Sequence, residues 1–385
     1  MPAIPPLKQM FSELIASPSV SSVSPEHDMG NRGVIELLSE WLEALGFHIE
    51  VVAVQDDPPK SNLIAVLGEG DDGLVLAGHT DTVPYDAGLW TQDPFTLTER
   101  DGKLFGLGTS DMKGFLAIAI EAARSFVETP LRRPLVLLAT ADEESTMHGA
   151  ERLVELGRPR ARYAVIGEPT GLVPIRMHKG VAMESLQLTG RSGHSSNPAL
   201  GINAIDGMHT ALGVLKDWRS ELAERHRHDG FEVPHPTLNL GHIHGGDNPN
   251  RICGHCLLNF DMRLLPEMRM EALRPELEER LREALDGSGL SMELKNLDVS
   301  VPAFETPADA VLVRMLEALT GHAARSVAFA SEAPHLQSLG IETVVLGPGD
   351  IEQAHQPDEF LRVDRIQPTL DLLDRLIRRV CLAED

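Results

Sequence analysis

The chain has 385 residues, with 34 lysines and arginines against 58 aspartates and glutamates, which gives a formal net charge of −24. This charge repels phosphate backbones and anionic lipid headgroups, so binding to nucleic acid or to a membrane surface is disfavoured as the main task. Hydrophobic residues make up 42% and charged residues 24%, as in soluble globular proteins, and the length predicts two domains that each bury a core.

The N-terminus and the cysteine content indicate the cellular compartment. Residues 1–8 have neither a basic region leading into an apolar run nor a small-residue cleavage site, so we expect no secretory signal. No stretch approaches the roughly 18 apolar residues that a membrane helix needs. Three cysteines do not make a disulfide framework in a chain of this length. We therefore expect a cytoplasmic protein.

Residues 1–180 alternate short apolar runs with helical patterns. Apolar spacing predicts helices at 11–16, 34–45, 115–126 and 150–156. Strand-like runs occur at 48–54, 62–67, 74–77, 134–140 and 163–166. This alternation predicts an α/β domain with a mixed, mostly parallel central sheet flanked by helices.

The pattern changes near residue 181 and returns after residue 302. Between these points, strands are predicted at 181–189, 237–244, 257–263 and 291–299, and helices at 203–218 and 270–285. The β-α-β-β-α-β order is that of a small α+β sandwich. The first pattern then resumes with a helix at 310–320, a strand at 343–346 and a closing helix at 367–380. We therefore predict a discontinuous domain at 1–179 and 302–385, interrupted by an inserted domain at 180–301.

Four predicted strands run into clusters of side chains that can bind metals. The clusters are His79-Thr80-Asp81, Asp142-Glu143-Glu144, Glu168-Pro169 and, after a short loop, His355. Because ligands gather at the carboxyl ends of strands in an open α/β sheet, these clusters can converge. Two histidines and several carboxylates form the nitrogen and oxygen ligand set that zinc accepts, and two metals would need a bridging carboxylate.

Each residue also has a structural explanation on its own. Asp111, between a glycine-rich turn and an apolar helix, has the features of an N-terminal helix cap. His79 could be a buried histidine with satisfied hydrogen bonds, and Glu143 could belong to an exposed acidic turn. Glu168 could be an ordinary strand-end carboxylate and His355 a loop residue. Their joint placement is what favours a metal site.

Five motifs together resemble the dinuclear-zinc family of aminoacylases, carboxypeptidases and desuccinylases. They are Gly-His-Thr-Asp-Thr-Val-Pro at 78–84, Gly-Thr-Ser-Asp-Met-Lys-Gly at 108–114, Asp-Glu-Glu at 142–144, Gly-Glu-Pro at 167–169 and Gln-Ala-His-Gln-Pro at 353–357. The resemblance covers essentially the whole chain. It implies a zinc-exopeptidase-like fold in which the discontinuous domain is catalytic and binds zinc, while the inserted domain is a lid through which a homodimer forms.

The resemblance implies two zinc ions per subunit, with cobalt as a possible substitute. One ion would be held by His79, Asp111 and Glu168. The other would be held by Asp111, Glu144 and His355. Asp111 would therefore bridge the two ions through its two oxygens, and a water or hydroxide would span the same gap.

The resemblance also implies the hydrolysis of an amide bond, and three more residues are expected to act in this reaction. Asp81 lies two residues after His79 in an extended segment, so it can orient the imidazole. Glu143 is free to act as general base on the metal-bound water and to pass the proton to the leaving amine. His194 is implied to stabilise the oxyanion in the active site of the partner subunit, although its Gly-His-Ser context is also that of an ordinary turn.

Four residues are expected to contact the substrate. Arg251, beside Asn250, could clamp a carboxylate with its planar guanidinium, and a surface salt bridge is the other interpretation. Glu332 could face a cationic side chain of the substrate. Gly347 lies in segment 346–349, one of four segments that resemble one member of the family more closely than the others.

A closer likeness within the family involves segments 236–247, 250–253, 331–334 and 346–349. It implies the hydrolysis of N2-acetyl-L-ornithine to L-ornithine and acetate in arginine biosynthesis. One alternative keeps the chemistry and changes the substrate: a desuccinylase, an acetylcitrulline deacetylase or a metallo-dipeptidase. Another is a non-catalytic binding protein of the same fold, and the free base Glu143 beside a complete ligand set argues against it.

Overall fold

The computed structural model describes residues 4–382, which form two compact units. The first unit takes its described residues from Met1–Arg176, Glu305–Arg325 and Ser331–Asp385. The second unit consists of Met177–Phe304 and Ser326–Ala330. The first three residues of the segment expected to lack a secretory signal lie outside the described residues. No described helix is long and apolar enough to cross a membrane.

A mixed sheet forms the centre of the first unit, in the order β1-β2-β6-β3-β7-β15-β8-β13, with β14 paired to β8. The strands are β1 (His48–Asp56), β2 (Pro59–Leu67), β3 (Leu74–His79), β6 (Leu135–Thr140), β7 (Tyr163–Ile166), β8 (Ile175–His178), β13 (Phe304–Glu305), β14 (Arg325–Val327) and β15 (Glu342–Val345). Strands β6, β3, β7 and β15 are parallel, whereas β1, β2 and β8 pair antiparallel. The predicted mixed, mostly parallel α/β sheet is confirmed.

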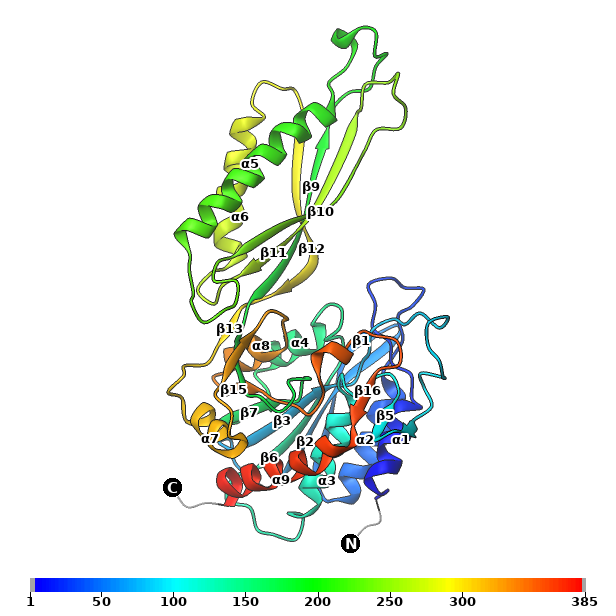
Figure 1. Ribbon diagram of the computed structural model, residues 1–385, viewed down its shortest axis with the longest axis vertical. Helices are drawn as coiled ribbons and strands as arrows, with labels where there is room; N and C mark the ends of the chain where they lie inside the picture. The colour runs from blue at the N-terminus through cyan, green and yellow to red at the C-terminus, as the bar shows by residue number, and fades with distance from the viewer. Residues whose placement is uncertain (1–3, 383–385) are drawn as a thin grey trace. The chain divides into compact units, whose positions relative to one another are not determined.

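Helices cover both faces of this sheet (Figure 1). One face carries α1 (Leu7–Ile15), α2 (Arg32–Ala44), α3 (Lys113–Arg124) and α9 (Ile366–Ile377), and the other carries α4 (His148–Leu156) and α8 (Ala333–Ser338). Helix α7 (Val311–Thr320) packs against α9 and β15. Every residue of β3, β6 and β7 is buried, which explains why these strands are continuous apolar runs in the sequence.

The second unit has a four-stranded antiparallel sheet in the order β10-β11-β9-β12. Its strands are β9 (Gly180–Thr189), β10 (Thr237–Gly245), β11 (His255–Leu264) and β12 (Ser291–Val301). Helices α5 (Ala204–Arg225) and α6 (Met270–Ala284) lie together on one face of the sheet (Figure 1). Trp218 of α5 is fully buried in the hydrophobic core of this unit. The element order is the predicted one.

The structure also contains elements that the sequence did not predict. A small sheet joins β4 (Thr98–Arg100), β5 (Lys103–Phe105) and β16 (Phe360–Arg362) in the order β16-β5-β4. Strands of three residues are too short to show a periodicity, which is why they were missed. Helix α5 also continues past the predicted end at 218, because Leu222 adds another buried position on the same face.

Gly167, between β7 and Glu168, provides a test of how tightly the central sheet and α3 pack. A Cβ atom at this position would lie 2.0 Å from Cγ of Phe115 and 2.1 Å from its Cδ1, inside the buried contact with α3. We therefore expect Gly167→Ala to lower the free energy of unfolding by about 1–3 kcal/mol through overpacking. Thermal unfolding followed by circular dichroism measures this effect.

Gly213→Ala is the matched control for this substitution. Gly213 lies in α5, is exposed, and has no atom within 4 Å of a built Cβ. Alanine favours the helix over glycine by about 1 kcal/mol, so this variant should be slightly stabilised. Equal melting temperatures for the two variants would show that the Phe115 ring yields to the extra methyl group.

Candidate metal centre

The register of three parallel strands brings the predicted ligands to one edge of the sheet. His79, the last residue of β3, pairs with Thr140, the last residue of β6. Ala77 of β3 pairs with Ile166 of β7, so Glu168 follows β7 at the level of His79. The loop after β6 then carries Glu143 and Glu144. Parallel pairing therefore converts strand ends that are far apart in sequence into neighbours.

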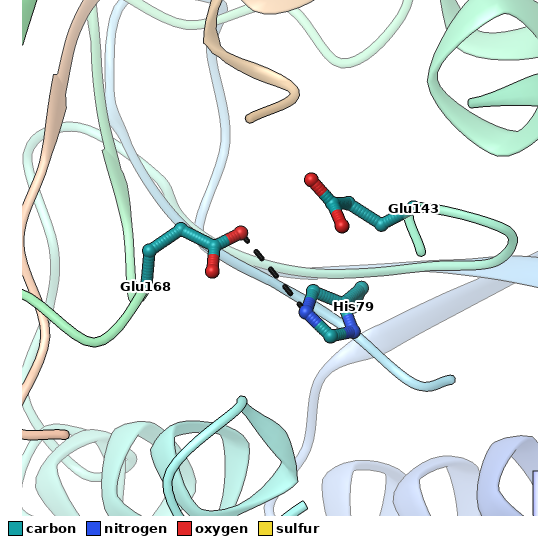
Figure 2. Close-up of side chains that lie close together, drawn as sticks. All are labelled: His79, Glu143 and Glu168. Atoms are coloured by element: carbon teal, nitrogen blue, oxygen red, sulfur yellow. Dashed lines mark ion pairs between the residues drawn. The ribbon is translucent and has the colours of Figure 1, made fainter. Parts of the chain in front are cut away.

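Two groups of side chains at this edge have ligand atoms close enough to share a metal ion. The first is His79, Glu143 and Glu168, and the second is His79, Asp111 and Glu144; within each group the ligand atoms lie within 4.8 Å of one another. Figure 2 shows the carboxylates of Glu143 and Glu168 pointing toward each other beside the His79 ring, whose Nε2 lies 4.0 Å from Glu168 Oε1. By geometry alone, Glu143 is thus as well placed as a ligand as it is as a base.

Asp111 stands between the two histidines. Its Oδ1 lies 3.1 Å from Nε2 of His79, and its Oδ2 lies 3.7 Å from Nε2 of His355. The same His355 nitrogen is 3.0 Å from Oε2 of Glu144. Each oxygen of Asp111 therefore faces a different histidine, which is the arrangement that a carboxylate bridging two ions requires.

The backbone determines which nitrogen His79 presents to the site. Its Nδ1 donates to the carbonyl oxygen of Asp81 at 3.0 Å, which leaves Nε2 facing the carboxylates. The Asp81 carboxylate is farther from the ring, at 3.7 Å, and its Oδ2 instead accepts from the backbone N–H of Glu144 at 3.0 Å. Asp81 thus holds the imidazole through its main chain and the acidic loop through its side chain.

Negative charge is concentrated and buried at this edge. Burial raises the pKa of Glu143 and of Glu168 well above the usual value, and repulsion from neighbouring carboxylates adds to the increase. The pKa of Glu144 is raised by burial and by the charge of Asp111. The hydrogen bond from His355 to Glu144 raises the pKa of that histidine to about 9. Such a cluster favours cations.

The fit to a metal is supported by carboxylate oxygens that have no other partner. Among the described residues, Glu168 Oε1, Asp81 Oδ1 and Glu332 Oε1 are buried without a hydrogen-bond partner. Buried polar atoms are normally satisfied, and unpaired buried carboxylates are costly. Two imidazoles and several carboxylates match the ligands that divalent zinc and similar ions accept, so the residues present fit a metal centre.

Two of the predicted substrate-contacting residues, Glu332 and Gly347, lie in the first unit. Glu332 is buried and accepts from the Thr140 hydroxyl at 2.8 Å, and burial raises its pKa to about 7. A Cβ at Gly347 would lie 2.1 Å from the carbonyl oxygen of Gly167 and 2.4 Å from that of Glu168. Gly347 therefore permits a close backbone approach behind Glu168, a predicted ligand.

The other predicted residues, His194, Asn250 and Arg251, form a separate group in the second unit. His194 and Arg251 pair in an isolated β-bridge, and the N–H of Ser195 donates to the Asn250 carbonyl at 3.1 Å. The Arg251 guanidinium forms an ion pair with Asp247 at 2.5 Å and is 53% exposed, as the alternative interpretation of a surface salt bridge expected.

The sequence did not predict two groups that contact the loops of the predicted metal ligands. Lys60 is buried and forms ion pairs with Asp28 at 2.6 Å and with Asp142 at 2.5 Å, while Asp142 adopts a left-handed conformation (φ 61°) beside Glu143. Glu359 is also buried and accepts from three backbone amides, including that of Asp111. Neither has a spacing signal, although the position of Glu359 four residues after His355 could have drawn attention to it.

Similar folds occur among solved structures. A tripeptidase from Staphylococcus aureus matches with a TM-score of 0.74 at 20% identity, over 97% of this chain and 98% of that one. An M20 family metallo-carboxypeptidase from Sulfolobus solfataricus matches with a TM-score of 0.74 at 17% identity, over 97% and 99%. At these identities the comparison establishes the fold.

Sequence comparison is more specific. Acetylornithine deacetylase from Pasteurella multocida is 50% identical over 99% of this chain and 100% of the relative. Acetylornithine deacetylase from Photorhabdus laumondii is 47% identical over 99% of both chains. Residues 75–379, which include every proposed metal ligand, match the model of peptidase family M20/M25/M40. The chain belongs to this peptidase family.

Proposed function

We propose that this chain hydrolyses N2-acetyl-L-ornithine to L-ornithine and acetate with a pair of zinc ions, as a step of arginine biosynthesis in the cytoplasm. Its family and relatives make it a metal-dependent amidohydrolase. The observation that carries the chemistry is the position of Asp111 between His79 and His355, with the buried Glu143 beside His79. The acetylornithine substrate is supported by the names of relatives that are about half identical over nearly their whole length.

The ligand assignment follows the side chains that face one another. His79, Asp111 and Glu168 would hold one ion, and Asp111, Glu144 and His355 would hold the other. When bound, two such ions supply Lewis-acid chemistry toward the amide carbonyl and toward water. Zinc and cobalt share this ligand set, so availability decides between them.

Glu143 is the proposed proton carrier. Burial and the charge of Glu168 raise its pKa well above the usual value, so the carboxylate accepts a proton more readily than an exposed glutamate does. Oε2 of Glu144 forms a hydrogen bond with Nε2 of His355 at 3.0 Å, so Glu143 is the member of the pair that is free to move a proton. It would take the proton from the attacking water and deliver it to the nitrogen of the leaving amine.

His194 is the proposed oxyanion donor. Its Nδ1 accepts from the backbone N–H of Ser196 at 3.2 Å, which leaves the proton on Nε2. An N–H at that position can stabilise the negative oxygen of the tetrahedral intermediate. We propose that it acts in the partner subunit of a homodimer formed through the second unit, whose edge strand β10 exposes Ile243 (53%).

Substrate recognition is assigned to groups with complementary charge. We propose that Arg251 and Asn250 bind the α-carboxylate of the substrate and that Glu332 faces its cationic side chain, with Gly347 nearby along the site wall. The unpaired Glu332 Oε1 supports this assignment, because a buried acceptor without a partner is suited to an ammonium group.

The proposed location in the cytoplasm is supported by the cysteines. All three are buried and free, and free thiols are usual in a reducing compartment.

Kinetics on a panel of substrates test the proposed reaction. We expect N2-acetyl-L-ornithine to give the highest kcat/KM with zinc-loaded enzyme, above N-acetylcitrulline, N-succinyl-diaminopimelate and a dipeptide. The cationic side chain distinguishes the first from acetylcitrulline, so Glu332 should favour it. A higher kcat/KM for any other member of the panel would assign the substrate to that member, and no turnover of any would favour a binding protein.

Glu143→Ala separates the base from a ligand. If Glu143 moves the proton, the variant should lose roughly 100- to 10,000-fold in kcat while keeping about two metal ions per chain. Metal analysis by plasma emission, paired with kinetics, measures both quantities. A fall in metal content together with activity would show that Glu143 is a ligand, as its proximity to His79 and Glu168 also allows.

His194→Ala should lower kcat by roughly 100- to 1,000-fold, the effect of removing one oxyanion donor, while metal content and melting temperature stay unchanged. His209→Ala is the control, because His209 is an exposed histidine of α5 in the same unit. Unchanged kcat in His194→Ala would remove this residue from the site.

Mixing the two inactive variants locates His194. If it acts in the partner subunit, dimers that contain one Glu143→Ala chain and one His194→Ala chain have one intact site, and the mixture should recover about a quarter of wild-type activity. No recovery after subunit exchange would place His194 in the site of its own chain.

A further inference from the structure

Glu359 is a buried carboxylate held by the glycine-rich loop that carries Asp111. Its Oε2 accepts from the N–H of Gly108 at 2.9 Å, and its Oε1 accepts from those of Ser110 and Asp111 at 2.7 and 3.0 Å. The residue is only 1% exposed. One side chain therefore binds three backbone amides within four residues, the last of them the amide of the proposed bridging ligand itself, in the manner of an anion in a nest of amides.

The loop depends on an external partner for its shape. Gly106 and Gly108 both have positive φ angles, of 152° and 87°. A Cβ at Gly108 would lie 2.7 Å from Cε of the buried Lys113, so this position requires glycine. Glycine gives the unfolded loop many accessible conformations, and the hydrogen bonds that the loop amides donate to Glu359 select one of them.

Glu359 also ties this loop to the segment that carries His355. The carbonyl oxygen of Glu359 accepts from Gly106 N–H at 3.0 Å, and the next residue begins β16, which pairs with β5 directly ahead of the loop. His355 itself has a φ of 59°, a left-handed conformation that costs energy in a residue with a Cβ. Glu359, four residues after His355, therefore joins the segment of His355 to the loop of Asp111 through hydrogen bonds of both its side chain and its backbone.

We propose that Glu359 is a positioning residue that sets the distance between Asp111 and His355 and thereby the affinity of the centre for its metals. This inference rests on the proposed metal centre. The ion assigned to Asp111, Glu144 and His355 takes two ligands from segments joined by Glu359, whereas the ion assigned to His79 and Glu168 shares only Asp111 with them. Loss of Glu359 should therefore weaken the former ion more.

Two variants and one control test the proposal. Glu359→Gln keeps the size of the side chain but replaces one acceptor oxygen with an amide group that cannot accept from a backbone N–H. Glu359→Asp keeps the charge but shortens the side chain by one methylene, so it cannot reach all three amides. Glu352→Gln is the control, because Glu352 is exposed in the short helix at Ile351–Gln353 and its replacement removes the same charge from the same segment.

The measurement is metal affinity by competition with a chelator, together with the absorption spectrum of bound Co²⁺. We expect both Glu359 variants to bind the ion assigned to Asp111, Glu144 and His355 roughly 10- to 100-fold less tightly, as for other residues that orient ligands, and to shift the Co²⁺ bands. Glu352→Gln should behave as wild type. A purely structural role would lower the melting temperature of the metal-free protein without changing the Co²⁺ spectrum of the folded protein.

The outcomes separate this inference from the function on which it rests. Wild-type affinity and wild-type Co²⁺ bands in both Glu359 variants would overturn the positioning role while leaving the metal centre in place. If the unaltered chain binds no pair of ions in the same titration, the metal centre itself is wrong. Equal weakening in Glu352→Gln would assign the effect to net charge and would also contradict the proposal.

Discussion

Electrostatic repulsion among buried carboxylates is the constraint on which the rest of the first unit depends. Glu143, Glu144 and Glu168 lie around His79 at one edge of the sheet, and the pKa of each is raised by burial and by repulsion from neighbouring carboxylates, which for Glu144 is that of Asp111. Left alone, such a cluster would favour protonation or local unfolding. Divalent cations bound by the proposed ligands would remove the repulsion, because the same oxygens would coordinate them. The cost of burying these charges together and the proposed affinity for metal would thus have the same origin.

The surrounding structure is arranged to hold these charges in place. The cluster lies at the ends of strands β3, β6 and β7, which are buried throughout. The register of these strands aligns His79 with the loops that follow β6 and β7. Around the cluster, the acidic loop after β6 and the loop that carries Asp111 are held by polar groups that are not themselves proposed as ligands. Asp81 accepts from the amide of Glu144, Lys60 forms an ion pair with Asp142 at the start of the acidic loop, and Glu359 accepts from the amide of Asp111 and from two amides before it. A site of this kind is precise because its loops are anchored at several points.

The sequence predicted the residues that local patterns mark, but not those whose contacts join segments far apart in the chain. His79 and Glu168 were predictable because each ends or follows an apolar strand, and parallel strands in an α/β sheet place such ends together. Asp111 was ambiguous, since the same residue type in the same context caps helices. In the structure Met112 is the N-cap residue of α3, and Asp111 instead approaches both histidines. The role of Glu359 was not predictable. Its three hydrogen bonds span about 250 residues of sequence, and the β16–β5 pairing that delivers it involves strands of three residues without a periodic pattern. The Lys60–Asp142 pair is of the same kind, as it joins β2 to a loop 82 residues later.

We propose that Asp111 bridges two ions between the His79 and His355 sides of the site. Anomalous diffraction at the zinc edge, from crystals of the zinc-loaded protein, locates these ions. We expect two peaks per chain, one beside each oxygen of Asp111, with His79 and Glu168 at one peak and Glu144 and His355 at the other. A single peak, or a peak coordinated by Glu143 with Asp111 bound to one ion alone, would contradict this proposal.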